Sequence, residues 1–533
     1  MISWSPPAKA YGIMDELLYQ VRKRLPSIDR ILDQFADKSL KDYFRELSYS
    51  QPQPLQTADD LLEAVVTYIA PILGEHTAKE LARDLENHPV VLTANHHGVD
   101  YFAQSFQGNF SFLLYRRKFA EGSTIAPIFV CGGIPLSNSS YPKGMLFYDA
   151  IQPDSGELPF KQPIFPNNLN QTTVHAAPRF NEDMVESAIK QLEKSLKIER
   201  ISKTAYETAR EILKEEYLDP LVLKQPDYSA QATLLNNRLG KRVFIEKKDL
   251  PELVYLEFET IAALLLKRDL NNPDSLAFRI FFDPDLRNAV IKHLNEKKGC
   301  WDLGKIARLV YGTVSADHPA HLGIGNGSVF FWGLDVLGRR YPLTIEDTKG
   351  ATPYLIGVDG FGEGHKIPFE PLSVLAALDA KLLFPNLFTM FAVVSLARAV
   401  TCIGGYFQSD YLPAIQNGLI EALNSTGGYS NYAEAVAGVT TDLYLSGMMF
   451  LLAGVNGRFA TPAGPIEIIS RGGLKDGFMN ELGSLFISDA HRIGLFNIYP
   501  DLVSRPERIE RWQESLAFEL NREDSKWVLP EAF

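Results

Sequence analysis

The sequence predicts an α/β protein built on a mostly parallel β-sheet, with N-terminal helices, a helical insertion and a helical C-terminal region. Three patterns lead to this prediction. Strand-like and helix-like segments alternate over residues 88–130, residues 181–217 are charged with apolar residues at helical spacing, and glycines and aromatic residues mark short strands after residue 310. Strands that alternate with helices are typical of parallel sheets.

Two short apolar runs, residues 90–94 and 125–130, carry the sheet prediction. They are rich in β-branched and aliphatic residues and flank a helix-length stretch over residues 101–117. A strand–helix–strand connection places its two strands in parallel in one sheet. We therefore expect these two runs to be neighbouring parallel strands.

The remaining segments follow from the same patterns. We expect four parts: a helical segment over residues 1–87, the first part of the core over 88–180, the helical insertion over 181–310, and a second α/β part with a helical C-terminal region over 311–533. Within them, the patterns predict an amphipathic helix over residues 250–270, a strand over 277–282, and helices over 59–85, 372–383 and 412–423.

Composition excludes several classes of protein. Hydrophobic residues make up 46% of the 533, enough for a sizeable core, and the net charge of −12 argues against sequence-independent nucleic-acid binding. The three cysteines, Cys131, Cys300 and Cys402, contain no CxxC pair, which favours a reducing compartment.

Neither export nor a membrane span is expected. The apolar stretch over residues 388–397 is shorter than the roughly 20 residues that span a bilayer, and the first residues lack the pattern of a secretory signal. We expect a soluble cytoplasmic protein whose partner is a small molecule, without nucleic-acid or membrane partners.

The turn Asn95-His96-His97-Gly98, with Asp100 after it, is the strongest candidate for an active site. It follows the first predicted strand, and ligands of parallel sheets bind at the carboxyl ends of the strands. Imidazoles there could transfer a proton or hold an anion. We expect His96, His97 and Asp100 to be catalytic and Asn95 and Gly98 to bind substrate. The alternative is a capped turn with exposed histidines.

A metal site is the second interpretation of the same residues. His96, His97 and Asp100 would then share a metal ion with His318 or His321, which follow Asp317. Pro319 lies between the last two histidines and disfavours a regular helix, so their spacing does not form a familiar metal motif.

Two distant parts of the chain resemble the bacillithiol cysteine-adding enzymes. Residues 93–98 (Thr-Ala-Asn-His-His-Gly) are similar to that family's Thr-Gly-Gln-Gln-x-Gly strand and turn. Residues 384–387 (Phe-Pro-Asn-Leu) and 403–406 (Ile-Gly-Gly-Tyr) resemble its Pro-Asn and Gly-Gly segments, in the same order. The resemblance implies a Rossmann-like core.

The resemblance does not extend to the family's activity. Histidines replace the paired glutamines, and residues 132–138 (Gly-Gly-Ile-Pro-Leu-Ser-Asn) replace the acidic, histidine-containing segment that the family has after its second strand. Because a fold does not determine a reaction, we carry over the architecture alone.

These observations favour a transferase or ligase-like enzyme that acts on a small polar or phosphate-bearing substrate. Ser137, Asn138, Gly404 and Gly405 would complete the substrate pocket, so the two glycines should line the same cleft as the turn at residues 95–98. A metal-dependent hydrolase and a non-catalytic ligand-binding protein are the alternatives. The sequence identifies no cofactor and no oligomeric state.

Overall fold

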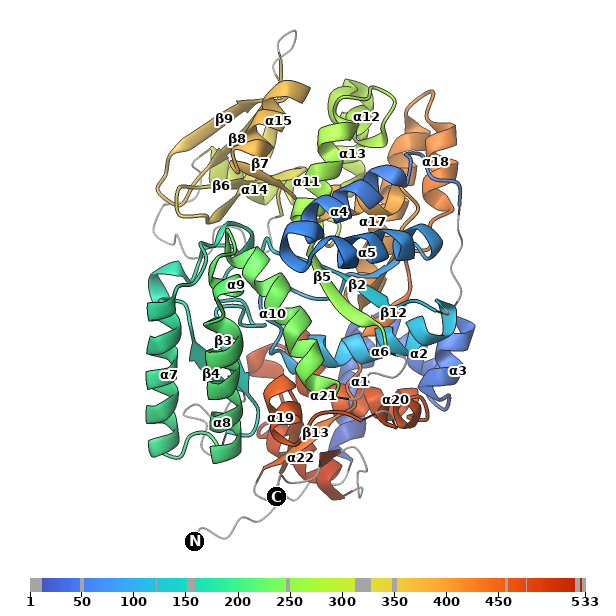
Figure 1. The fold of residues 1–533 in the computed structure, drawn as a ribbon. Coiled ribbons are helices and arrows are strands. Elements are labelled where there is room, and N and C mark those ends of the chain that lie inside the picture. The colour runs from blue at the N-terminus through green and yellow to red at the C-terminus, as the bar shows by residue number, and fades with distance from the viewer. Residues whose placement is uncertain are drawn as a thin grey trace.

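The computed structural model describes residues 12–47, 52–120, 122–150, 159–245, 250–311, 327–347, 352–455, 459–475, 477–522 and 528–529 (Figure 1). A five-stranded parallel sheet forms its centre, in the spatial order β12-β11-β1-β2-β5. Its strands are β1 (Val90–Leu92), β2 (Ile125–Val130), β5 (Glu252–Glu257), β11 (Thr401–Gly405) and β12 (Tyr444–Ser446). The α/β class and the parallel pairing of β1 with β2 are confirmed.

The strand order reverses once, between β1 and β11. From β1 the chain adds β2 and then β5 on one side, and later adds β11 and β12 on the other side. β1 and β11 are paired in parallel, with Val90 opposite Thr401 and Leu92 opposite Ile403. Loops that leave neighbouring strands in opposite directions open a crevice at such a point.

Helices cover both faces of this sheet because alternate strand residues point to opposite sides. Val90 and Leu92 belong to one core cluster and Val91 to the other. The Val91 cluster contains residues of α4 (Asp59–Leu73), α5 (Glu75–Asn87), α11 (Phe258–Asp269), α13 (Pro284–Leu294), α17 (Gln408–Ser425) and α18 (Ser430–Ala437). The Val90 cluster contains residues of α1 (Ile13–Arg24), α2 (Pro26–Phe35), α3 (Leu40–Glu46), α6 (Ala103–Phe119), α10 (Tyr228–Val243) and α21 (Ile487–Leu502).

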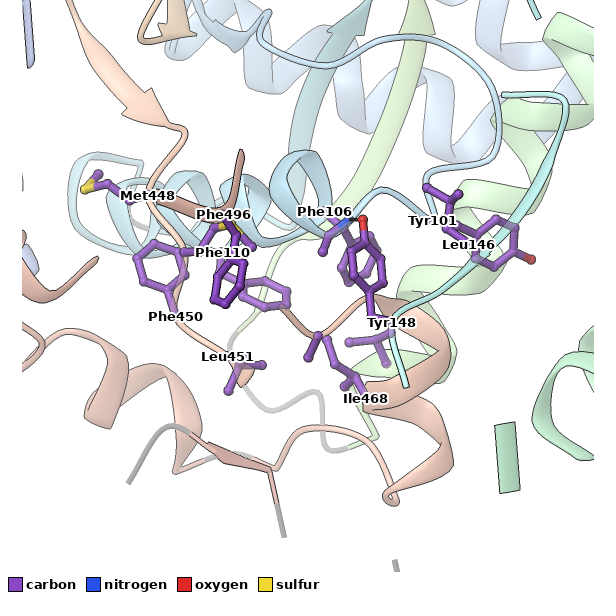
Figure 2. Packing of buried hydrophobic residues seen from close by; sticks show 14 of the residues in the cluster. Tyr101, Phe106, Phe110, Leu146, Tyr148, Met448, Phe450, Leu451, Ile468 and Phe496 are labelled. Atoms are coloured by element: carbon purple, nitrogen blue, oxygen red, sulfur yellow. Dashed lines mark hydrogen bonds between the residues drawn. The ribbon is translucent and has the colours of Figure 1, made fainter. Parts of the chain in front are cut away.

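Helix α6 crosses the core beneath the sheet and is buried over almost its whole length. Figure 2 shows Phe106 and Phe110 of this helix among Tyr148, Phe450 and Leu451. Most polar residues of α6 are buried as well, and buried polar groups need hydrogen-bond partners. The helix therefore depends on tertiary contacts on every side.

Gln107 of α6 supplies such partners to the backbone of Phe450, Leu451 and Ala463, which flank a pair of strands. Its amide nitrogen donates to the carbonyl oxygens of Leu451 (3.0 Å) and Ala463 (2.8 Å), and its oxygen accepts from the backbone of Phe450 (2.7 Å) and Leu451 (2.9 Å). One buried side chain thus joins α6 to residues 450, 451 and 463.

A second, antiparallel sheet lies apart from the first, at the upper left of Figure 1. Its order is β10-β6-β7-β8-β9, and α14 (Leu303–Val310) and α15 (Pro371–Asp379) pack beside it. The strands are β6 (Phe331–Leu334), β7 (Arg340–Glu346), β8 (Tyr354–Val358), β9 (Gly364–Pro368) and β10 (Leu383–Pro385). The glycine- and aromatic-rich composition after residue 310 reflects this meander.

Smaller elements complete the fold. β3 (Gly144–Phe147) pairs with β4 (Phe160–Pro163), and β13 (Leu452–Val455) pairs with β14 (Phe459–Pro462) and β15 (Val528–Leu529). The other helices are α7 (Glu182–Lys197), α8 (Lys203–Ile212), α9 (Pro220–Leu223), α12 (Leu276–Phe282), α16 (Leu387–Phe391), α19 (Pro465–Ser470), α20 (Phe478–Leu482) and α22 (Trp512–Arg522). Single turns are η1 (Asn167–Leu169), η2 (Val174–Ala176), η3 (Leu213–Tyr217), η5 (Ala392–Leu396) and η6 (Arg505–Glu507).

The apolar stretch over residues 388–397 forms α16 and η5 within the Val91 core cluster. Buried Arg398 follows it and donates two hydrogen bonds to the carboxylate of Asp269, at 2.7 and 3.1 Å. Among the helices in the described parts of the chain, none has the length and apolar content required to cross a membrane.

Two secondary-structure predictions are wrong. Residues 277–282, expected as a strand, belong to α12, because Ser275 caps the helix by accepting from the Phe278 amide at 3.1 Å. Residues 250–270, expected as one helix, form β5 and then α11. Short apolar runs do not distinguish a buried strand from a buried helix by periodicity. As a consequence, the range 181–310, expected as a helical insertion, contains an edge strand of the central sheet.

Gln107→Met should destabilise the protein by about 1–3 kcal/mol, because the backbone of Phe450, Leu451 and Ala463 loses four buried hydrogen bonds. The matched control is Gln171→Met, which changes an exposed glutamine and should leave stability within about 0.5 kcal/mol. Thermal unfolding of both variants measures the difference. Equal unfolding temperatures of the two variants would show that the hydrogen bonds of Gln107 do not stabilise the fold.

Candidate functional site

A cavity of about 1010 Å³ opens at the carboxyl ends of the five central strands. Each strand contributes at least one residue at its end or within two residues after it: Thr93, Cys131, Glu259, Gly405 and Ser446. The cavity therefore lies at the reversal of strand order, where the ligands of open parallel sheets bind.

The second sheet and one loop form the opposite wall. Trp332 of β6, Arg340 of β7 and Phe384 of β10 line the cavity, as does Lys298 in the loop between α13 and α14. The wall thus combines aromatic rings with positive charges, and it is supplied by parts of the chain far from the central strands.

The two adjacent histidines lie in different environments. His96 lines the cavity, where its Nδ1 lies 3.3 Å from the Ser140 hydroxyl. The ring is exposed to the cavity but surrounded by protein, and this enclosure lowers the pKa of His96 below its usual value; Asn138 opposes the shift and Arg340 adds to it. Of the two histidines, His96 is the one that can meet a ligand directly.

His97 points away from the cavity into the core. Its Nε2 lies 2.8 Å from the Ser229 hydroxyl, and that hydroxyl contacts Tyr68 at 3.2 Å. Burial lowers the pKa of His97, so the ring is neutral. The expected catalytic role of His97 is not supported by this position, because a residue behind the cavity wall does not touch a ligand.

Asp100 is also behind the wall, in a buried hydrogen-bond network that reaches the cavity through Asn95. The Asn95 amide nitrogen donates to Asn109 (2.9 Å) and Asp100 (3.3 Å), and Tyr255 donates to Asp100 at 3.1 Å. Burial raises the pKa of Asp100 to about 7. The oxygen of the Asn95 side chain has no hydrogen-bond partner within the described protein, although Asn95 lines the cavity.

Gly98 and Gly404 have structural roles. Gly98 has a φ of 122°, and a Cβ there would lie 2.4 Å from Pro142, so only glycine fits. Gly404 packs against the Gln408 side chain, which would lie 2.2 Å from a Cβ at that position. Gln408, not Gly404, lines the cavity at this point, while Gly405 lines it directly.

Ser137 and Asn138 do not line the cavity, whereas the next two residues of the chain do. The carbonyl oxygen of the Asn138 side chain accepts from the backbone of Ser140 at 3.1 Å and from its hydroxyl at 3.0 Å. This turn presents Ser139 and Ser140 to the cavity instead. The predicted segment is therefore at the site, but through its next two residues.

Two glycines after β2 hold an acidic side chain against the cavity. Gly132 and Gly133 each donate a backbone hydrogen bond of 2.7 Å to one carboxylate oxygen of Glu259. Burial, and then the negative charge of Glu257, raise the pKa of Glu259 to about 7. A carboxyl group on the cavity wall is thus close to its protonation midpoint at neutral pH.

A buried ion pair lies directly behind Glu259. His175 of η2 contacts Glu257 with an Nδ1–Oε1 distance of 3.0 Å, and its backbone amide donates to the Gly132 carbonyl at 2.9 Å. Burial opposes the charge of Glu257, but the imidazole outweighs it and lowers the pKa of Glu257 to about 2. The two neighbouring carboxyl groups therefore differ widely in pKa.

Arg340 and Lys298 bring positive charge to the cavity without a carboxylate partner. Arg340 donates to the Gly133 carbonyl at 2.6 Å and lies 4.5 Å above the Trp332 ring. Lys298 lies 3.9 Å above the Phe407 ring. In the described part of the chain neither makes a salt bridge, in contrast to Lys305, which pairs with Asp302 at 2.9 Å.

Helix α17 begins at the same cavity, directly after β11. Phe407 and Gln408 at its start line the cavity, and no side chain caps its first turn. The dipole of this 18-residue helix adds positive potential at its N-terminus, which Asp410 in the first turn partly offsets. This potential has the same sign as that of Arg340 and Lys298.

Among the described residues, His96, His97 and Asp100 of the predicted metal site do not converge. Within the described ranges, the one group of three close potential ligands is Asp359, Glu363 and His365, in the turn between β8 and β9. His96, His97 and Asp100 do not form such a group. His318 and His321 lie outside the described residues.

Several residues of the site were missed by sequence reasoning. Cys131 and Glu259 each follow a buried strand within two residues, so the strand-end argument that identified Asn95 applies to them as well. The prediction of one helix over residues 250–270 does not identify Glu259, because it contains no strand end at residue 257. Arg340 and Lys298 carry no local signal, since only the tertiary fold brings them to the cavity.

Comparison of the chain with models of protein families, with curated protein sequences and with solved structures finds no match.

The two histidines should respond differently to alanine. His97→Ala should lower stability by about 1–3 kcal/mol, because it opens a small hole and removes a buried partner of Ser229. His96→Ala, the matched control one residue earlier, should leave the unfolding temperature unchanged because its ring is exposed. Thermal unfolding of both variants makes the comparison. The reverse order of stabilities would show that the two rings have been assigned to the wrong environments.

Proposed function

We propose that the cavity binds a small anionic molecule, carrying a phosphate or carboxylate group, and that the protein is a transferase or ligase-like enzyme with a Rossmann-like core. The observation that carries the proposal is the convergence of Arg340, Lys298 and the start of α17 on one cavity, without carboxylates paired to these two side chains. Positive groups left without partners favour an anionic ligand.

The type of anion site follows from the chemistry of these groups. The Arg340 guanidinium keeps donors free beyond the one that bonds Gly133, and such a fork can hold two oxygens of a phosphate or carboxylate. His96 and Ser140 add neutral hydrogen-bonding groups on the same wall. Trp332 and Phe384 add apolar surface for the remainder of the ligand.

Strand order and cavity size support the rest of the proposal. The order β5-β2-β1-β11-β12 corresponds to the order 3-2-1-4-5 of Rossmann sheets, with the cavity at the reversal. A volume of about 1010 Å³ is at the upper end of small-molecule pockets, so it has room for two small substrates. Group transfer and ligation both require two.

The remote relationship to the bacillithiol cysteine-adding enzymes remains part of the proposal. Its three segments each contribute to the cavity wall, through Asn95 and His96, through Pro385 and Asn386, and through Gly405. This supports a shared architecture. The different residues at positions 96, 97 and 132–138 argue for a different substrate.

The two alternatives are weaker. A metal-dependent hydrolase would need ligands that meet, whereas His97 and Asp100 turn away from His96 behind the cavity wall. A non-catalytic binding protein would have the same anion site, and it is distinguished by turnover. Metal analysis of protein purified without a histidine tag, and assays for consumption of any ligand found by thermal shift, separate the three.

The anion site predicts that pyrophosphate stabilises the wild-type protein against heat and binds with measurable heat in calorimetry. Arg340→Gln and Lys298→Gln should each weaken pyrophosphate binding about tenfold or more, because each removes a charge-assisted contact. The controls are Arg279→Gln and Lys292→Gln, which neutralise charges outside the cavity lining and should not change the affinity. Unchanged binding in both cavity variants would refute the anion site.

A further inference from the structure

Glu259 is an acidic side chain in the wall of a cavity that we propose binds an anion. Three other acids line the cavity, and two of them have partners: Asp302 pairs with Lys305, and Asp501 accepts a hydrogen bond from Tyr406. Glu259 makes no salt bridge in the described part of the chain. Its two hydrogen bonds come from neutral backbone amides, so among the described residues no positive side chain forms a hydrogen bond with it.

The position of Glu259 relative to the anion site is fixed by one residue. The Gly133 amide donates to Glu259 at 2.7 Å, and the Gly133 carbonyl accepts from Arg340 at 2.6 Å. The Glu259 carboxyl group and the Arg340 guanidinium are thus hydrogen-bonded to the amide and the carbonyl of the same glycine. An anion held by Arg340 would lie next to the Glu259 carboxyl.

Charged and titratable groups from four parts of the fold interact with Glu259 or its neighbours. Glu257 lies on β5, His175 on η2, Arg340 on β7, and Cys131 follows β2. Glu257 and His175 act on the pKa of Glu259 with opposite sign, and Arg340 adds an attraction that also favours the ionised form. An anion bound to Arg340 would cancel this support and add a repulsive charge of its own.

We propose that Glu259 takes up a proton from solvent when an anion binds at Arg340, so that the cavity binds its anionic substrate together with a proton. The inference rests on the proposed function. The carboxylate of Glu259 gains an O–H bond, its negative charge disappears, and no bond of the substrate changes. The neutral carboxylic acid can then donate a hydrogen bond to the bound substrate, whereas an ionised carboxylate can only accept one.

The balance of charges makes this uptake measurable near neutral pH. The pKa of Glu259 is raised to about 7 without a ligand, chiefly by burial and then by Glu257, so the group is largely ionised at pH 7.5. A neighbouring anion raises this pKa further because it destabilises the charged form. By linkage, proton uptake is largest between the free and bound pKa values and vanishes below the free value.

His96 does not produce the same signal. Its pKa is lowered from the usual value, so it begins to gain a proton at lower pH than Glu259 does. Uptake through His96 would therefore grow as the pH falls from 7 to 5, whereas uptake through Glu259 disappears over that range. The pH dependence separates the two groups.

The test is titration calorimetry of the full-length protein with sulfate, an anion that does not itself titrate between pH 5 and 9. Measurements at pH 7.5 in two buffers of different ionisation enthalpy give the number of protons taken up per sulfate. We expect roughly half a proton for the wild-type protein and none for Glu259→Gln. The variant should also bind sulfate more tightly at pH 8, by several-fold, because the repulsive charge is absent.

Glu467→Gln is the matched control. Glu467 is buried, accepts from the backbone amides of Tyr148 (2.8 Å) and Gly464 (2.9 Å), and has a pKa raised to about 8, but it does not line the cavity. It should keep the wild-type proton uptake. If Glu259→Gln does not fold, the wild-type protein alone carries the test: sulfate affinity should fall from pH 6.5 to 8.5.

Two results would overturn the inference while the anion site stands. In one, the wild-type protein binds sulfate without proton uptake and with an affinity independent of pH. In the other, Glu259→Gln binds sulfate with undiminished uptake. If neither sulfate nor pyrophosphate binds the wild-type protein, the proposed function itself fails and the inference falls with it.

Discussion

The pairing of β1 with β11 is the constraint on which the rest of the molecule depends. About 300 residues separate these strands in the chain, yet their backbones are hydrogen-bonded side by side. Beyond the paired residues, the Thr93 amide donates to Ile403 at 2.8 Å, and the Thr93 hydroxyl bonds the Gln408 amide. The strand-end turn of the first half of the chain and the helix start of the second half are thereby placed at one edge of the sheet.

The Gly132-Gly133 segment connects this edge to the second sheet. A Cβ at Gly132 would lie 2.3 Å from Glu257, and one at Gly133 would lie 2.6 Å from Phe384 of β10. Glycine is needed here for close approach, because neither position has a left-handed backbone conformation. The same two residues bind a carboxylate through their amides, and an arginine and a backbone amide through their carbonyls, so they organise both walls of the cavity.

Much of the fold could be predicted from local sequence. β1, α6 and β2 are recognisable because apolar runs of strand length flank a run of helix length. β5 was not recognisable in this way: its buried residues continue without a break into α11, so no polar turn marks the boundary. Periodicity cannot divide a segment that is apolar on both sides of the boundary.

The site was predictable only where its residues follow a strand. Asn95 and His96 could be found because the polar turn stands out after an apolar run, but whether each side chain faces the cavity could not. His96 and His97 are adjacent and chemically identical, and the backbone direction of the turn sends one to the cavity and the other to Ser229. Arg340 and Lys298 belong to a different sheet and a different loop, whose approach no local pattern encodes.

The long separation between β1 and β11 also has a consequence during synthesis. At about 5–20 residues per second, the ribosome needs on the order of tens of seconds to add the chain between β2 and β11. Throughout that interval the edge of β1 that later pairs with β11 leaves its backbone N–H and C=O groups without a strand partner. The central sheet of this protein can therefore be completed only after more than 400 residues of the chain have been synthesised, because β11 and β12 lie so late in the sequence.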